Sequence, residues 1–326
     1  PGFGSAEVEA VTDVLESGMV ADGPEVRAFE RAFAEHCGVT HAVATSNGTT
    51  ALHTALTALG IGAGDRVVTT PLSFVASANA IRLAGARPVF ADIDPDTYTL
   101  DPDATRDAVR DTDADAILAV HLYGLPADMA SLSDIAATED VVLIEDAAQA
   151  HGATYNGESV GTVGDAAAFS FYPTKNMTTG EGGMVLTEDE TVADRAASFI
   201  NHGRTGDDSY AHERVGHNFR MTSLAAAIGR VQLDRLPKWV RNRRANADTL
   251  TDGLRTVDGI TTPREPDGRT HAYHQYTIRT SKRDRLRAAL AERGVDTGIY
   301  YPTPIHELAA YQDFDSTAPV AETAAE

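Results

Sequence analysis

The chain has 326 residues, enough for a large buried core and for two domains of unequal size that share a cleft. Its 48 acidic and 27 basic residues give a formal net charge of −21, which excludes the basic stripe that binding to nucleic acid requires. The 42% apolar content is that of a folded protein, and with no membrane-length apolar run or signal-peptide pattern we expect a cytoplasmic protein without a membrane partner.

The charge balance also favours a halophilic protein. Lysine is nearly absent, with only Lys175, Lys238 and Lys282, and arginine supplies the other basic residues. Self-repulsion at this net charge is tolerable where salt screens it over a few ångströms. The alternative is an ordinary acidic cytosolic enzyme.

Short apolar runs alternate with amphipathic, helix-length segments from residue 5 to about residue 235. The predicted helices cover residues 6–17, 49–59, 77–83 and 129–137. The predicted strands cover residues 41–45, 66–70, 88–93, 116–121, 141–144, 166–172 and 184–186. Strands that alternate with helices indicate a mainly parallel sheet covered on both faces, so we expect a large α/β domain over residues 1–236.

Residues 237–326 are expected to form a smaller C-terminal α+β domain, against which the first residues of the chain could pack. A helix is predicted over residues 223–244, kinked or divided by Pro237. A strand near residues 273–280 and a helix with Leu286, Ala289 and Leu290 on one face follow. The sequence begins without Met and stops inside a predicted helix, so we expect further residues at both ends and an incomplete small domain.

Three polar segments follow predicted strands, at residues 45–50, 145–151 and 170–176. In an open α/β sheet, ligands bind at the carboxyl ends of the strands, where the connecting loops gather. The first segment places Gly48 and Thr49 at the start of a helix, where backbone N–H groups can hold a phosphate. An ordinary capped turn has the same residues.

The second segment places Glu145 and Asp146 directly after a continuous apolar strand of the kind found at a sheet centre. A carboxylate in this position is costly unless a cation or a hydrogen-bond donor meets it. A protonated pyridine nitrogen would serve, and so would a metal ion. No spacing in the chain supplies a convincing set of metal ligands, so we expect no metal. A solvated loop acid is the other interpretation.

The third segment contains Lys175, followed by glycines at positions 180, 182 and 183. A lysine that forms a Schiff base has to be held in a cleft, and glycines let the backbone approach a bulky cofactor closely. Most lysines are solvated surface residues. In a chain almost without lysine, a lysine beside a glycine-rich turn is stronger evidence for a Schiff-base role than it would be in an ordinary chain.

Together these motifs resemble the DegT–DnrJ–StrS aminotransferase family. The resemblance runs from about residue 3 to the last residue, with every block in the family's order. The matching blocks lie at residues 46–49, 145–152, 169–176, 180–183, 201–203 and 216–221.

The resemblance implies the aspartate-aminotransferase fold, known as fold type I, with pyridoxal 5'-phosphate as the cofactor. It makes Lys175 the Schiff-base lysine and the proton carrier. Asp146 would pair with the pyridine nitrogen and keep it protonated, so that the ring accepts electrons. The other implied cofactor contacts are Gly48, Thr49 and Ser170 at the phosphate, Phe74 stacked on the ring, and Gln149 against its other face or at its oxygen.

The resemblance also implies partners. Asn218 would reach the phosphate of the neighbouring subunit's cofactor, which makes the active unit a homodimer. Tyr301 and His306 would contact the sugar or the amino donor. Two departures from the family are that its segment after residue 319 is not present, and that its usual tyrosine at position 217 is His217.

The implied reaction moves an amino group, from glutamate as the family's usual donor, to a keto group of a nucleotide-linked sugar, as in polysaccharide biosynthesis. One alternative is a relative that acts on a non-sugar ring, such as an inositol or an aminobenzoate precursor. A sugar-dehydrating branch replaces the Schiff-base lysine with histidine, and Lys175 argues against it. A non-catalytic regulator would need a DNA-binding surface or the loss of Lys175 or Asp146, and the chain has neither.

Overall fold

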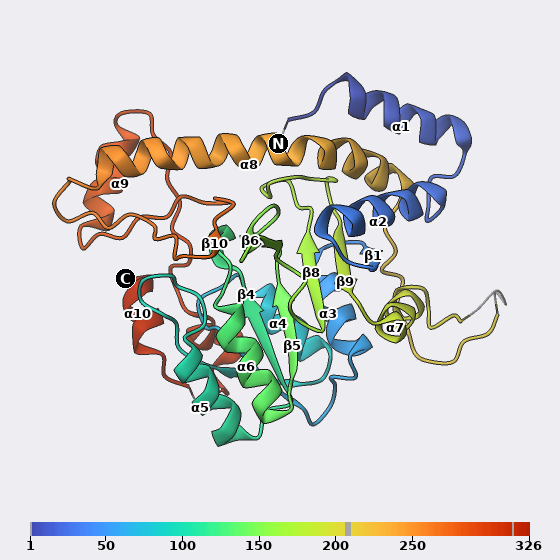
Figure 1. The fold of residues 1–326 in the computed structure, drawn as a ribbon, viewed down its shortest axis with the longest axis horizontal. Helices are drawn as coiled ribbons and strands as arrows, with labels where there is room; N and C mark the ends of the chain where they lie inside the picture. The colour runs from blue at the N-terminus through green and yellow to red at the C-terminus, as the bar shows by residue number, and fades with distance from the viewer. Residues whose placement is uncertain (1, 206–209, 315) are drawn as a thin grey trace.

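The computed structural model describes residues 2–205, 210–314 and 316–326. At its centre lies a seven-stranded sheet with the order β1-β9-β8-β5-β4-β2-β3 (Figure 1). Only β9 runs antiparallel to its neighbours, β1 and β8, so the sheet is mainly parallel as predicted. The strands are β1 (His41–Thr45), β2 (Arg66–Thr69), β3 (Arg87–Phe90), β4 (Ala116–Val120), β5 (Val142–Asp146), β8 (Ala166–Ser170) and β9 (Gly183–Thr187). All seven predicted strands are confirmed, with ends that shift by at most three residues.

Helices cover both faces of this sheet. One face packs against α3 (Gly48–Ala58), α4 (Ala76–Leu83) and α7 (Glu190–Ile200). The other face packs against α2 (Pro24–Cys37) and α8 (Ser223–Leu254) on one side and α5 (Pro102–Thr112) and α6 (Met129–Glu139) on the other. Neighbouring residues of a strand therefore enter opposite clusters, as Val67 and Val68 do, because successive side chains of a strand alternate between faces.

Three of these helices, α2, α5 and α7, were not predicted from the sequence. Their start signals are present, since Pro24 and Pro102 lie in the first turn of α2 and α5. The Asp189 side chain accepts hydrogen bonds from the Thr191 and Val192 amides and caps α7.

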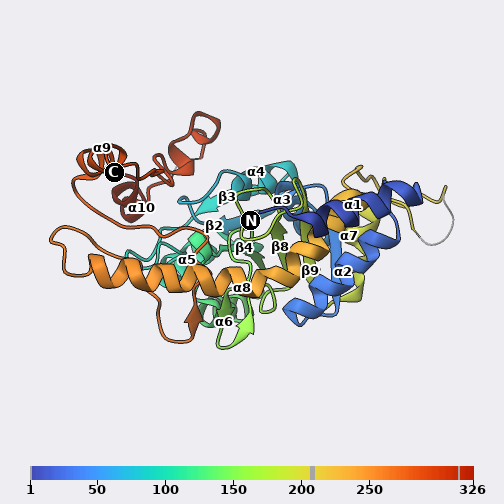
Figure 2. The same ribbon diagram turned by 90° about the horizontal axis from the view of Figure 1, so that it is seen from above.

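Helix α8 crosses the whole molecule, with α1 (Ser5–Ser17) and α2 near its N-terminal end and α9 (Arg283–Ala291) near its other end (Figures 1 and 2). Of the two predicted effects of Pro237, a kink or a division, the division is wrong, because α8 is a single helix of 32 residues. Leu233, Leu236 and Val240 flank the proline and are buried in one cluster with α2, so packing holds the helix across the missing backbone bond. The predicted domain boundary after residue 236 falls inside this helix.

The C-terminal region contains little regular structure besides α9 and α10 (Pro319–Ala325), both of which were predicted. The predicted strand near residues 273–280 is wrong. Its only pairing is an isolated bridge between Thr261 and Arg279, because no neighbouring strand in the described residues runs beside it. A small antiparallel sheet joins β10 (Arg269–Thr270) to β6 (Thr154–Tyr155) and β7 (Glu158–Ser159). Short 3-10 turns form η1 (Leu122–Gly124), η2 (Ile305–Glu307) and η3 (Ala309–Tyr311).

The first helix, α1, packs on the N-terminal half of α8. The Glu7 carboxylate accepts hydrogen bonds at Oε1 from Gln232 Nε2 (2.8 Å) and Arg235 Nη1 (2.7 Å). Among the helices that the structure describes, none combines the length and the apolar character needed to cross a bilayer.

Candidate active site

A cavity of about 880 Å³ lies where the segments after β1, β2, β5 and β8 meet, beside the end of β4. Eight of the ten residues that the sequence analysis singled out line it. These eight are Gly48, Thr49, Phe74, Asp146, Gln149, Ser170, Lys175 and Tyr301. The carboxyl ends of the strands thus gather the three polar segments into one cleft, as expected.

Asp146 ends β5 and is only 5% exposed. Ser77 Oγ donates a hydrogen bond to its Oδ2 (2.7 Å), and the Ala148 amide donates to its Oδ1 (3.1 Å). Burial raises the pKa of Asp146, whereas these two hydrogen bonds and the charge of Lys175 act in the opposite direction. A buried carboxylate with unused lone pairs therefore faces the cavity.

Lys175 is half-buried and lines the same cavity. Burial lowers the pKa of Lys175, and the nearby charge of Asp146 opposes this shift. Within the described residues, its Nζ has no hydrogen-bond or ion-pair partner. The next residue anchors the loop, because Asn176 Nδ2 donates to the His151 carbonyl (3.3 Å) and the Ala272 carbonyl (3.1 Å). The chain thus presents an amine that loses its proton more readily than an exposed lysine does.

The start of α3 forms the second wall of the cavity. Asn47 caps the helix by accepting a hydrogen bond from the Thr50 amide at Oδ1 (2.9 Å). The Gly48 and Thr49 amides have no acceptor in the described part of the chain. A Cβ atom at position 48 would lie 2.6 Å from Ser170 Cβ, so only glycine permits this close approach. Free amides at a helix start form a site for an anion such as phosphate.

Gln149 and two aromatic rings complete the site. Gln149 Oε1 accepts from the Tyr123 amide (2.7 Å), and its Nε2 donates to the Tyr301 hydroxyl (3.1 Å), so its side chain has one orientation. Phe74 is 56% exposed, and its ring centre lies 6.4 Å from that of Tyr301. Both rings and Gln149 thus line the same cavity as the buried carboxylate of Asp146.

Sequence reasoning missed several residues of this cavity, among them Ser77 and His274. Ser77 appeared only as the first residue of a predicted helix, and no local pattern indicates its contact with Asp146. His274 was assigned to the strand that does not form. Its Nδ1 is buried without a partner, and burial lowers the pKa of His274 to about 2, so the imidazole is neutral.

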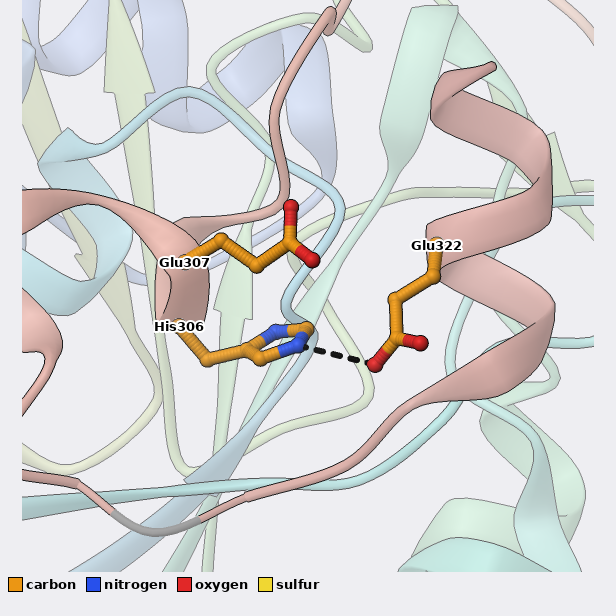
Figure 3. A group of neighbouring side chains, drawn as sticks. All are labelled: His306, Glu307 and Glu322. Carbon is orange, nitrogen blue, oxygen red and sulfur yellow. Dashed lines mark hydrogen bonds and ion pairs between the residues drawn. The ribbon is translucent and has the colours of Figure 1, made fainter.

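The structure places Asn218 and His306 outside this cavity. Asn218 is exposed and pairs with Asn201 through an isolated backbone bridge. His306 is buried, and its Nε2 lies 3.1 Å from Glu322 Oε1 on α10, with Glu307 beside it (Figure 3). Glu322 Oε1 also accepts from the Ala318 amide (3.0 Å), so this group fastens η2 to the start of α10.

Glu145 precedes Asp146 but points to the other face of β5. It is fully buried and accepts hydrogen bonds from the amides of Gly161 (2.7 Å), Val163 (2.9 Å) and Gly164 (2.8 Å). His121 Nδ1 accepts from the Ala127 amide (3.0 Å), so the ring proton lies on Nε2, which is 2.8 Å from Glu145 Oε2. Glu145 thus fastens the loop that leads into β8 and towards Lys175.

We expect Glu145→Gln to lower the free energy of unfolding by about 3–5 kcal/mol, because the amide cannot accept at one of its two positions and leaves buried donors unpaired. Denaturant unfolding at neutral pH measures this loss. Glu139→Gln is the control, since Glu139 pairs with Arg110 (2.7 Å) at the surface and should change stability little. Equal unfolding midpoints for the two variants would contradict the assignment.

The pH dependence of stability should differ as well. Although burial alone raises the pKa of Glu145, the hydrogen bonds from His121 and the loop amides bring this pKa below its ordinary value. A lowered folded-state pKa contributes stability that is present above the pKa of the unfolded chain and is lost as the pH falls through the folded value. The difference between wild type and Glu145→Gln should therefore shrink at acid pH.

Comparison with known proteins identifies the family of the chain. The model of the DegT/DnrJ/EryC1/StrS aminotransferase family matches residues 2–326. The chain belongs to this family. The resemblance found in the motifs is therefore confirmed.

Several curated members of the family resemble the chain over most of its length. A dTDP-3-amino-3,4,6-trideoxy-alpha-D-glucose transaminase of Streptomyces venezuelae is 41% identical, over 93% of this chain and 79% of that protein. A GDP-perosamine synthase of Escherichia coli O157:H7 is 37% identical, over 99% and 88%. A "pleiotropic regulatory protein" of Geobacillus stearothermophilus is 43% identical, over 92% and 80%.

Solved structures of family members have the same fold. S. venezuelae DesV, solved with a ketimine intermediate, superposes with a TM-score of 0.95 at 40% identity and covers 98% of this chain and 87% of that chain. The 3-amino-5-hydroxybenzoic acid synthase superposes with a TM-score of 0.94 at 32% identity, over 100% and 90%. The predicted type I α/β fold is thereby confirmed.

The structure shows what surrounds His217, the residue at which the family usually has tyrosine. The His217 ring stacks on Phe219 with centres 4.5 Å apart and an interplanar angle of 1°. Both rings also contact His53, which lies on α3. An aromatic ring at position 217 therefore packs against the helix that opens the anion site.

Proposed function

We propose that this aminotransferase moves an amino group from glutamate to a keto group of a nucleotide-linked sugar, with pyridoxal 5'-phosphate as its cofactor. The observation that carries the proposal is that Lys175 and Asp146 line one cavity. The names of the S. venezuelae and E. coli relatives, which act on dTDP- and GDP-sugars, support the substrate class. Polysaccharide biosynthesis is the corresponding process.

The residues of the cavity fit this cofactor. The unpaired amides of Gly48 and Thr49, with the Ser170 hydroxyl beside them, would hold its phosphate. The buried carboxylate of Asp146 would meet the protonated ring nitrogen. Phe74 and Gln149 would contact the ring from either side.

When bound, pyridoxal phosphate supplies an aldehyde that condenses with amines and a ring that takes up electrons from the reacting carbon. Lys175 Nζ would provide the amine that holds this aldehyde, and the same amine would act as the base and acid that moves a proton during amino transfer. Its lowered pKa suits both tasks, because a neutral amine is needed to attack and to take up a proton. The Asp146 carboxylate would hold the ring nitrogen in its protonated form.

The proposal also covers the residues that would contact the substrate and the partner subunit. Tyr301 lines the cavity and is proposed to contact the sugar or the donor, whereas the placement of His306 gives its proposed contact no support. The exposure of Asn218 is compatible with its proposed reach to the neighbouring site in a homodimer. We also propose residues 1–236 and 237–326 as the two domains, a cytoplasmic location, and adaptation to salt, for which the net charge of −21 is the support.

The test is a two-stage assay on purified protein loaded with pyridoxal phosphate. Glutamate alone should convert the visible absorption of the bound cofactor to that of its amine form. A panel of nucleotide-linked 3-keto and 4-keto sugars, with product mapping by NMR, should then give one amino sugar.

Two outcomes would contradict the proposal. Amination of a non-sugar ring ketone alone would favour the activity named for the 3-amino-5-hydroxybenzoic acid synthase. A protein that binds no cofactor would favour a regulatory relative such as the one named in G. stearothermophilus.

A further inference from the structure

Two buried hydroxyl groups stand behind Asp146. Ser73 and Ser77 are 4% and 1% exposed and belong to the short segment that enters α4. Ser77 Oγ lies 2.7 Å from Asp146 Oδ2, and Ser73 Oγ lies 3.2 Å from Ser77 Oγ. The segment also carries Phe74, which forms part of the cavity wall.

The direction of these hydrogen bonds follows from the proton count. Ser77 has one hydroxyl proton and three acceptors within reach: Asp146 Oδ2 at 2.7 Å, Ser73 Oγ at 3.2 Å and the Phe74 carbonyl at 3.4 Å. An ionised carboxylate only accepts, and the shorter, charge-assisted bond is the stronger one. Ser77 therefore donates to Asp146, and Ser73 donates to Ser77, so the two hydroxyls polarise one another towards the carboxylate.

The Asp146 carboxylate needs these hydrogen bonds because its burial removes it from water, which would otherwise stabilise the charge. Burial is the largest influence on the pKa of Asp146 and raises it, and the hydrogen bond from Ser77 is the largest influence that lowers it. The Ala148 amide, Lys175 and His121 follow in that order. Of the titratable groups that face Asp146 from other elements, namely Lys175, His121 and Tyr301, none touches it within hydrogen-bond distance.

We propose that Ser77, backed by Ser73, is the positioning residue that keeps Asp146 ionised and oriented towards the cavity. The inference rests on the proposed function, in which Asp146 holds a protonated ring nitrogen. Because Phe74 lies between the two serines, the same segment sets the aromatic wall and the acid together. The site would thus take a flat, cationic heterocycle between the two.

The experiment compares wild type, Ser77→Ala, Ser77→Thr and Ser73→Ala. Equilibrium dialysis measures the affinity for pyridoxal phosphate as a function of pH. Isotope-edited infrared spectroscopy of the cofactor-free protein, with Asp146→Asn to identify the band, measures the ionisation of Asp146 directly. Thermal unfolding shows that each variant is folded.

In Ser77→Ala the pH at which Asp146 ionises should rise by about one unit, since a hydrogen bond to a charged group contributes roughly that much. The acid limit of cofactor binding should rise with it by about one pH unit, so that below this limit the affinity should be about tenfold lower than that of wild type at the same pH. Ser77→Thr retains the hydroxyl and should resemble wild type, and Ser73→Ala should show a smaller shift in the same direction.

An unchanged ionisation of Asp146 in Ser77→Ala overturns the proposal, and so does an unchanged pH dependence of binding. If Ser77→Ala does not fold, Ser73→Ala decides, and the absence of any shift in that variant overturns the proposal. A wild-type protein that binds no pyridoxal phosphate refutes the proposed function instead, while the infrared titration still decides whether Ser77 holds the carboxylate.

Discussion

Replacement of Lys175 by alanine abolishes amino transfer and leaves a folded protein. The side chain lines the cavity with its Nζ free of partners in the described residues, so its loss removes the proposed nucleophile and proton carrier without breaking a structural contact. We expect the turnover rate to fall by at least about a thousandfold, the scale of proton-transfer and covalent catalysis. Steady-state assays with glutamate and the accepted keto-sugar measure it.

The composition of the chain provides a matched control. Lys238 lies exposed on α8 and is one of only three lysines, so Lys238→Ala removes the same functional group from the surface. Its activity should equal that of wild type. Normal turnover in the Lys175→Ala protein would refute the role assigned to this amine. A circular dichroism spectrum that shows the variant to be unfolded would mean that Lys175 is a structural residue.

The second large effect concerns salt. With 48 acidic and 27 basic residues, the folded chain compresses a strongly negative charge into a small volume. Screening acts over about 3 Å in 1 M salt and about 10 Å in 0.1 M salt, so repulsion between neighbouring surface acids grows on dilution. We expect the melting temperature to fall on the order of 10 °C between about 2 M and 0.1 M potassium chloride, which corresponds to several kcal/mol for a chain of this size.

Three exposed acids on α1 allow the cause to be tested. Glu9, Asp13 and Glu16 repeat at spacings of four and three residues on one helix, and like charges at these spacings repel. The triple variant E9Q/D13N/E16Q should lose less stability at low salt than wild type does. Sucrose, which stabilises by exclusion and carries no charge, should not reproduce the effect of potassium chloride. A melting temperature that is independent of salt would contradict adaptation to salt and indicate an ordinary acidic protein.

Two errors in the fold prediction, at Pro237 and at residues 273–280, have a physical reason in the structure. Pro237 removes one backbone hydrogen bond, but Leu233 and Leu236 before it and Val240 after it are buried against the core, and this packing lets α8 continue. The apolar pattern at residues 273–280 resembles a strand, but a strand also needs a partner for its backbone groups, and the described chain offers it one bridge. The local sequence pattern shows neither the packing around Pro237 nor the lack of a partner strand for residues 273–280.

The amino-acid sequence by itself determined the alternating α/β architecture and the position of Lys175, Asp146 and Gly48 at strand ends. These features depend on periodicity and on the general rule that parallel strands present their carboxyl ends at one edge. Tertiary structure alone decided that Ser77 meets Asp146 across 69 residues, that Gln149 meets Tyr301 across 152, and that His306 turns to Glu322 and away from the cavity. Such contacts join segments that are distant in the chain, and the packing of those segments, which no local window contains, sets which side chains meet.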